Sequence, residues 1–217
     1  MKKIHYSVLT LVLGLVLSGS SCNANDEPND PADDANGVVI NGVTWATRNV
    51  DAPGTFAAKP EDSGYFYQWN REKGWPGTFG PISDWNSTTP SGITWEKAND
   101  PCPTGWRVPT RDEFDKLLNA SKVSREFIDY GTQQIPVMKF TDKTTGKSIY
   151  LKPADNRSSG DGWHNSEGST GYYWSSTNST IYPDGSAFFL LFDREVAELW
   201  EDGYGRGNGF SIRPVKE

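Results

Sequence analysis

Apolar residues in this chain occur mainly as aromatic rings and short runs, and this distribution limits the folds that it can adopt. The sequence has nine Trp, nine Tyr and ten Phe, together with 22 Gly and 14 Pro. After the first 17 residues, its longest continuous apolar run is AFFLLF, residues 187–192. Such a run predicts a central strand that is buried on both faces. The many rings and turn residues predict an irregular, loop-rich fold with an aromatic core.

The N-terminal residues have the features of a secretory signal peptide. Lys2 and Lys3 give a positive start, residues 8–17 are mostly apolar, and residues 18–21 are small. The apolar run is too short to cross a membrane comfortably. We therefore expect residues 1–21 to be removed as a signal peptide.

Cys22 follows this segment directly and resembles the lipidated cysteine of a bacterial lipobox. The lipobox usually has leucine three residues before the cysteine, where this chain has Gly19. The resemblance implies a lipid-modified Cys22 that anchors the protein to a membrane without spanning it. The alternative is plain secretion with cleavage near this position.

The next segment, NANDEPNDPADDAN at residues 23–36, has no large apolar residue. It cannot bury surface, so we expect residues 22–37 to be the lipidated cysteine followed by an acidic, disordered tether. An acidic stretch behind a lipidated cysteine also resembles the export signal of surface lipoproteins in the Bacteroides group. This resemblance implies an outer-membrane lipoprotein that is exposed on the cell surface.

The charge of the chain excludes two classes of partner. Removal of residues 1–21 takes away Lys2 and Lys3 and no acid, so the net charge changes from −7 to −9. The sequence has no basic patch of the kind that nucleic acid or anionic lipid requires. Contact with a membrane is therefore expected only through the lipid anchor. Residues 38–217 are long enough for one domain with its own core.

Local patterns predict strands in the first part of this domain. GVVINGVTWATRNV at residues 37–50 predicts a hairpin, because Asn41-Gly42 suits a two-residue turn with positive φ at both positions. GYFYQWN at 64–70 is rich in β-forming residues and predicts a strand. Residues 71–93 have no apolar period and predict a long loop. The rings expected to pin this loop are Trp75, Phe79 and Trp85.

The segment VPTRDEFDKLLNAS gives the clearest helix signal. Thr110 is a good N-cap residue, and Glu113 three positions later completes a capping box. The apolar side chains of Phe114 and Leu117 fall on one helical face. A second short helix is expected over residues 124–130.

The C-terminal half predicts further strands. VMKFTDKTTGKSIYLKP predicts a hairpin with its turn near Thr145-Gly146, and GYYWSST predicts a strand. The segments REVAELW and GFSIRPV could complete an antiparallel sheet. Pro214 has no N–H to donate, so the last strand is expected to lie at an edge or to end there.

Several segments, in this order, resemble one known family. They are VTWATRNV, GYFYQWN, DPCPTGWRVPTRDEF, LKPADNR, GYYWSST and GFSIRPVKE. Residues 38–217 are similar to the Fibrobacter succinogenes major paralogous domain, which is related to the formylglycine-generating-enzyme-like branch of the C-type lectin-like fold. The resemblance implies an α+β, C-type lectin-like fold of short, twisted antiparallel strands with one or two helices and long irregular loops. It also implies that the N- and C-terminal strands meet. Members of this family are mostly without a known activity.

Four roles are open to Cys102. A disulfide needs a partner, but lipidation would consume Cys22, and Pro214 stands where many relatives carry a second cysteine. A zinc site needs more ligands than Cys102 and His164 can supply. A thiol nucleophile needs a base, for which His164 is the only candidate. The fourth role, a small buried thiol packed near Trp106, is the one that we favour.

The loop ADNRSSGDGWHNSEGSTG is crowded with oxygen-bearing side chains. Asp155, Asn156 and Asp161 are candidates to bind a ligand, and calcium, which takes six to eight oxygens, could bind among them. The loop lacks the EF-hand pattern, and the sequence indicates no other metal site and no cofactor. The alternative is a solvated, turn-rich loop.

Exposed tryptophan rings could stack on the apolar faces of sugars. The candidates are Trp75, Trp85 and Trp163, because they stand in predicted loops. The alternative is that each ring plugs the core. The tryptophans expected in the core are those in strand-like or family segments: Trp45, Trp69, Trp106 and Trp174. For Arg107 and Arg213 we expect buried or half-buried structural salt bridges.

These features lead to three functional hypotheses. The first is a non-catalytic cell-surface lipoprotein that binds an external glycan or protein. The second is a structural or assembly subunit of an envelope or surface complex, in which the aromatic loops pack on a protein partner. The third is an enzyme related to the formylglycine-generating branch. That chemistry uses two cysteines in the C-terminal part, where this chain has none, and it would require an exposed Cys102 beside a base or metal.

Overall fold

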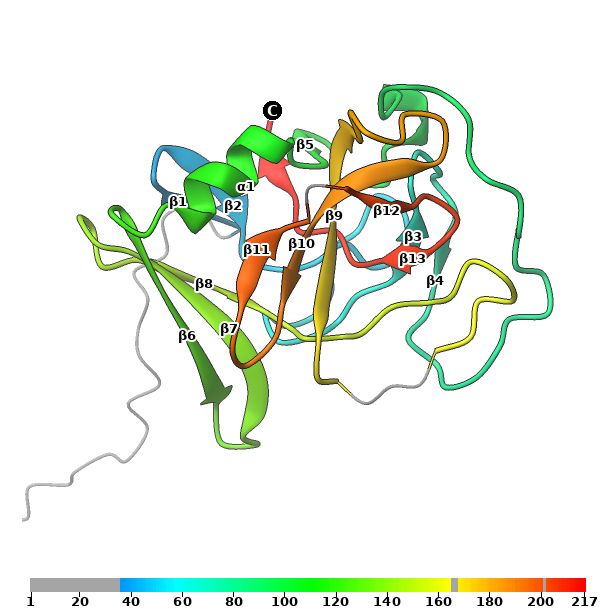
Figure 1. Ribbon diagram of the computed structural model, residues 1–217. Coiled ribbons are helices and arrows are strands. Elements are labelled where there is room, and N and C mark those ends of the chain that lie inside the picture. Colours follow the sequence, from blue (N-terminus) through cyan, green and yellow to red (C-terminus); the bar gives the residue numbers. More distant parts are fainter. Residues whose placement is uncertain (1–35, 165–167, 201) are drawn as a thin grey trace, which may run out of the picture.

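The computed structural model describes residues 36–164, 168–200 and 202–217 (Figure 1). The described residues form fourteen strands, β1 to β14, one α-helix and a short 3₁₀ helix, η1 (Lys97–Asn99). The strands make four small sheets in which neighbours run antiparallel. The predicted signal peptide, the predicted lipidation site Cys22 and most of the predicted tether lie outside the described residues. No helix in the described part is long and apolar enough to cross a membrane.

The first sheet joins the two ends of the domain, as the family resemblance implies. Its order is β1-β2-β14-β5, with these bounds: β1 (Gly37–Ile40), β2 (Val43–Ala46), β5 (Trp106–Arg107) and β14 (Val215–Lys216). The predicted Asn41-Gly42 hairpin is confirmed, with φ of 45° and 77° at the two turn residues. The strand expected in GFSIRPV ends before Pro214, as predicted, and a separate short strand, β14, begins after the proline and lies between β2 and β5. Pro214 precedes this strand and contributes only its carbonyl, which accepts a hydrogen bond from Ala46 N at 2.8 Å.

The central sheet contains the long apolar run. Its strands are β9 (Gly171–Asn178), β10 (Ser186–Phe192), β11 (Ala197–Leu199) and β12 (Tyr204–Gly205). β10 pairs with β9 on one side and with β11 and β12 on the other, so the predicted central strand is confirmed. Leu190 and Phe192 belong to one core cluster, whereas Ala187 and Phe189 belong to a second cluster on the opposite face.

Two three-stranded sheets accompany the central sheet. One contains β6 (Val123–Tyr130), β7 (Ile135–Asp142) and β8 (Ser148–Leu151), and the other contains β3 (Phe66–Gln68), β4 (Gly74–Trp75) and β13 (Gly209–Phe210). The hairpin predicted around Thr145-Gly146 is confirmed by the pairing of β7 with β8. The helix predicted over residues 124–130 is wrong, because all eight residues of β6 pair with β7. Pairing along a whole neighbouring strand overrides the weak helical preference of a short segment.

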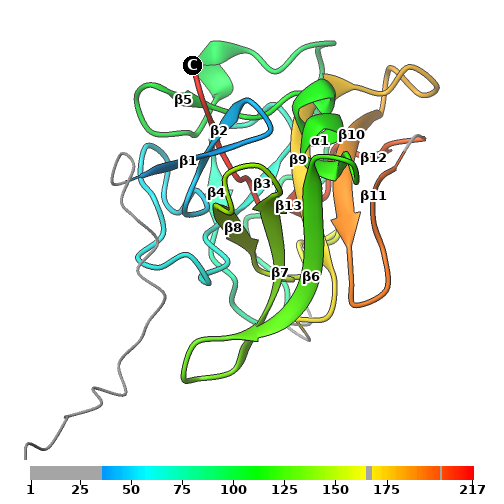
Figure 2. The same cartoon turned by 90° about the vertical axis from the view of Figure 1, so that its left-hand side faces the viewer.

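The single α-helix of the described residues, α1 (Arg111–Leu118), begins where the sequence predicts. Glu113 N donates to Thr110 Oγ1 at 3.3 Å, and Thr110 N donates to Glu113 Oε2 at 2.7 Å, which completes the capping box. Arg107 forms the predicted half-buried salt bridge, with its guanidinium 2.6 Å from the Glu113 carboxylate. Phe114 and Leu117 belong to the first core cluster, and Figure 2 shows α1 above the sheet of β6 to β8.

The expectation of an α+β, C-type lectin-like fold is wrong. One eight-residue α-helix and four small antiparallel sheets make the described chain β-rich. The reason is visible in the sequence of β6, where aromatic and β-branched residues pair as a strand instead of forming a second helix. Among the described residues, the buried hydrophobic side chains lie between Val38 and Val215.

Arg213 is fully buried and joins its own segment to three others. Its Nε donates to Asn49 Oδ1 at 2.8 Å, and its two terminal nitrogens donate to the carbonyls of Ala46 at 3.0 Å and Tyr150 at 2.8 Å, with Pro60 at 3.4 Å. No described carboxylate forms a salt bridge with it, so the predicted salt bridge is wrong. Burial lowers the pKa of Arg213 to about 10, which still leaves the guanidinium charged at neutral pH.

We expect Arg213→Lys to lower the free energy of unfolding by about 3 kcal/mol, because an ammonium cannot reach all of these acceptors and leaves buried carbonyls unpaired. Urea unfolding followed by tryptophan fluorescence measures this change. The matched control is Arg194→Lys on the surface, for which a change below about 0.5 kcal/mol is expected. Equal effects of the two substitutions would contradict the role of Arg213.

Candidate functional site

Two long loops that carry most of the predicted site residues meet at one end of the molecule. Gly80 N donates to His164 O at 2.8 Å, and His164 N donates back to Gly80 O at 3.2 Å. Ile82 N donates to Asp161 O at 3.0 Å. These backbone hydrogen bonds align residues 74–85 with residues 155–164, although the sequence separates them by more than 70 positions.

The buried side chain of Arg157 forms hydrogen bonds with both loops. Its Nη1 donates to Gly162 O at 2.6 Å and to Gly80 O at 3.2 Å. Nη2 donates to Thr78 O at 2.7 Å, and Nε donates to Pro76 O at 3.1 Å. Burial lowers the pKa of this guanidinium, which forms no salt bridge with a described carboxylate. One planar side chain therefore sets the relative position of the two loops.

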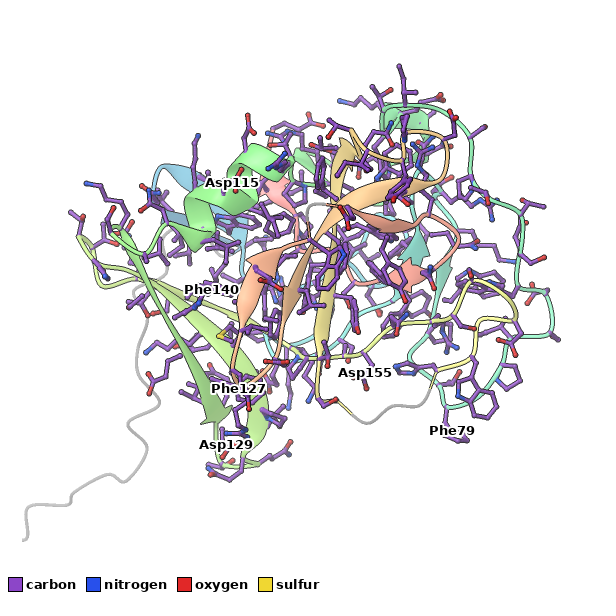
Figure 3. All side chains as sticks on the ribbon, viewed as in Figure 1. Phe79, Asp115, Phe127, Asp129, Phe140 and Asp155 are labelled. Carbon is purple, nitrogen blue, oxygen red and sulfur yellow. The ribbon has the colours of Figure 1, made fainter. Side chains whose placement is uncertain are left out.

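A pair of exposed rings stands on this frame. Phe79 is 70% exposed and Trp163 is 45% exposed, and their centroids lie 5.4 Å apart with planes at 69°. Trp163 N donates to Asp161 Oδ1 at 3.0 Å, and Ser158 N donates to Trp163 O at 3.0 Å, which fix the backbone of the tryptophan. Figure 3 shows Phe79 at the lower right edge of the molecule, away from the central sheet. We call Phe79 and Trp163 the ring pair.

The other two candidate tryptophans, Trp75 and Trp85, pack against each other. Trp75 is only 5% exposed, and its ring packs 5.4 Å from that of Trp85, with Lys73 Nζ 4.0 Å from the Trp75 ring centre. Trp85 Nε1 donates to Ser159 O at 3.0 Å. A Cβ at Gly162, where φ is +68°, would come within 2.7 Å of the Trp85 ring, so this position requires glycine. Trp75 and Trp85 thus support the loops instead of offering a free face.

The carboxylates of the second loop are engaged by backbone donors. Asp155 is buried, with φ of 57°, and accepts hydrogen bonds from the backbone N–H groups of Gly168, Ser169 and Thr170 at 2.5 to 3.2 Å. Asp161 is exposed, and its hydrogen bonds from Ser158 Oγ and Trp163 N lower the pKa of its carboxyl group.

The three predicted oxygen ligands do not converge on one point. Asp155 turns toward the segment after residue 167, Asp161 closes its own turn, and Asn156 is half-buried between them. Within the described residues no group of three or more His, Cys, Asp or Glu side chains could hold a metal ion. The carboxylates that suggested calcium in the sequence therefore have a structural use as turn caps.

His164 and Cys102 have separate surroundings. His164 is buried, with Nε2 2.9 Å from Ala154 O and its ring 4.7 Å from that of Phe66. Cys102 is a free cysteine that packs against the second core cluster, and its N–H donates to Asp100 Oδ1 at 2.9 Å. Burial, together with the nearby Asp100 carboxylate, raises the pKa of the thiol well above its usual value.

We expect Cys102 to react with iodoacetamide at pH 8 at least about tenfold more slowly than a cysteine in a short peptide, because a raised pKa keeps the thiol protonated. Mass spectrometry of the labelled chain measures the rate. The control is the same chain unfolded in guanidinium chloride, where Cys102 and the peptide cysteine should react at the same rate. Fast labelling of the folded chain at pH 7 would contradict this and favour the enzyme hypothesis.

Two features of this site were not assigned to it from the sequence. Phe79 was expected to pin its loop, yet it is one of the most exposed rings. Arg157 gave no local signal, because its carbonyl partners Pro76 and Gly80 lie 81 and 77 positions away. Short-range patterns cannot report such contacts.

The comparisons with known proteins establish the family. Residues 23–216 match the family model of the Fibrobacter succinogenes major domain, so the chain belongs to this family. The resemblance drawn from the sequence segments is thereby confirmed at the level of the family. No curated protein and no solved structure matched the chain.

Proposed function

We propose that this chain is a non-catalytic lipoprotein of the outer-membrane surface, whose domain binds an external glycan through the ring pair Phe79 and Trp163. The observation that carries the proposal is the exposure of two adjacent rings on loops that are otherwise firmly held. Rings that served only stability would gain by burial, as Trp75 does beside them.

The geometry of the ring pair suits a sugar. Pyranose rings present apolar C–H faces that stack on aromatic side chains, and two rings at 69° offer two differently oriented faces. Asp161 is exposed next to Trp163, so its carboxylate can also accept a hydrogen bond from a sugar hydroxyl. Because Arg157 and the backbone bridge fix both loops in advance, little conformational entropy is lost on binding.

The test uses residues 23–217 on a broad glycan array, followed by calorimetry with the best ligand. We expect Trp163→Ala and Phe79→Ala each to weaken binding at least about tenfold, because each removes one stacking face. The affinity for the glycan should be the same in calcium as in a chelator, since the carboxylates of Asp155 and Asp161 accept hydrogen bonds from backbone N–H groups.

The matched control is Tyr182→Ala, which removes an equally exposed ring from another loop and should change affinity less than about twofold. Glycan binding that survives both substitutions in the ring pair would contradict the proposed site. Silence on the array, together with capture of a surface protein that depends on Trp163, would favour the alternative of an assembly subunit.

The lipid anchor is tested separately. We expect the full chain to fractionate with membranes and to incorporate labelled palmitate, and Cys22→Ser to lose the label because the acceptor thiol is gone. The control is Cys102→Ser, whose fractionation and label should match the unchanged chain. Palmitate label that persists in the Cys22→Ser chain, or an unchanged full chain that takes up no label, would contradict lipidation at this position.

A further inference from the structure

Two exposed rings, Trp200 and Tyr204, and the half-buried ring of Tyr172 lie at the border of the second core cluster, on the face of the central sheet that carries Phe189. Strand register places Tyr172 opposite Leu191, and Leu191 opposite Glu198, in one row across β9, β10 and β11. In the next row Trp200 N donates to Phe189 O at 3.2 Å, so Trp200 faces the same side as Phe189. Tyr204 pairs with Ala187 at the start of β12.

These rings are held in place by one buried ring beneath them. Phe189 is 1% exposed, and its centroid lies 5.9 Å from Tyr172, 6.4 Å from Trp200 and 5.6 Å from Tyr204. Tyr172 and Trp200 stack on it at 16° and 30°. Trp200 is nevertheless 43% exposed and Tyr204 is 42% exposed, so each presents an outer surface to solvent. We call Tyr172, Glu198, Trp200 and Tyr204 the sheet-face strip.

The strip is negatively charged. Glu198 is exposed in the same row as Tyr172. Burial raises the pKa of Tyr172, and Tyr204, Asp155 and Asp193 raise it further, which places two more carboxylates within electrostatic reach of this hydroxyl. The chain as a whole has a net charge of −7.

Elsewhere in the described residues, aromatic rings are often covered by a cation of the chain itself. Seven such pairs occur: Arg48 on Phe56, Lys73 on Trp75, Arg111 on Phe188, Arg157 on Phe66, Arg194 on Phe127, Arg206 on Trp69 and Lys216 on Trp106. Across the part of the chain that the structure describes, no Lys or Arg lies over Tyr172, Trp200 or Tyr204. The strip therefore offers ring faces that no described cation covers, although the guanidinium of Arg125 donates to the carbonyl of Ala197, next to Glu198.

We propose that the sheet-face strip binds an arginine side chain from a basic segment of a partner protein. The planar guanidinium stacks on the outer face of Trp200 and forms hydrogen bonds with the Glu198 carboxylate. Carboxylates beside the rings favour this cation over a neutral sugar, which gains no charge complementarity there. The strip is built from β9 to β12, whereas the ring pair stands on loops at the lower right edge (Figures 1 and 3), so this proposal is independent of glycan binding.

The test is calorimetry of residues 23–217 with a hexa-arginine peptide at low and at physiological salt. We expect Trp200→Ala and Glu198→Gln each to raise Kd by about fivefold or more, because each removes one half of the cation site. Trp200→Phe, which keeps a ring, should retain part of the affinity. Glu198→Gln alters only an exposed polar group, so it keeps the test valid where a ring substitution disturbs the sheet.

The matched controls are Glu126→Gln, an exposed carboxylate on β6, and Tyr182→Ala, an exposed ring outside the strip. Both should leave Kd within about twofold. Equal losses in Glu198→Gln and Glu126→Gln would show diffuse attraction to net charge and would overturn the proposal. Absence of peptide binding, or binding of a neutral oligosaccharide through Trp200 instead, would overturn it as well.

Discussion

The buried hydrogen bonds between guanidinium groups and backbone carbonyls are the constraint on which this structure depends. Long loops without a partner strand leave carbonyl groups that must find donors once they are buried. Arg157, Arg206 and Arg213 supply these donors, each within a different set of loops. None forms a salt bridge with a described carboxylate, so the positive charge is shared among carbonyl dipoles. The four small sheets and the loops between them are thereby held in fixed positions around the two core clusters.

The same constraint explains where the exposed rings stand. Arg157 fixes the two loops that carry Phe79 and Trp163. Arg206 similarly bonds to Gly92 O and Pro183 O, and so joins two further loops beside the central sheet. Side chains at the tips of such loops need not fold inward, because the backbone carbonyls below them already accept hydrogen bonds from the arginine. A loop-rich surface can then present rigid aromatic groups to a ligand without losing stability.

The sequence predicted those features that depend on neighbouring residues. The Asn41-Gly42 turn and the Thr110–Glu113 capping box are local, and both are present. The apolar run of β10 also predicts a buried strand from neighbouring residues alone. By contrast, residues 124–130 read as a helix until β7 supplies a partner strand, and the carbonyl partners of Arg157 are set only by the tertiary fold. For the candidate site, the loops and Trp163 could be predicted, whereas Phe79 and the roles of Trp75 and Trp85 required the packing.

The position of β14 has a consequence for how the chain folds. This strand lies between β2 and β5, and Arg213 just before it bonds to segments near residues 46, 60 and 150. The first sheet therefore cannot be completed until β14 has paired with both β2 and β5, because its middle position stays empty until then. A chain stopped short of residue 215 would leave the N-terminal hairpin without a neighbour. Because Val215 pairs with Trp45, 170 positions earlier in the sequence, the first sheet is completed by a contact of very long range, and such contacts favour late formation in folding.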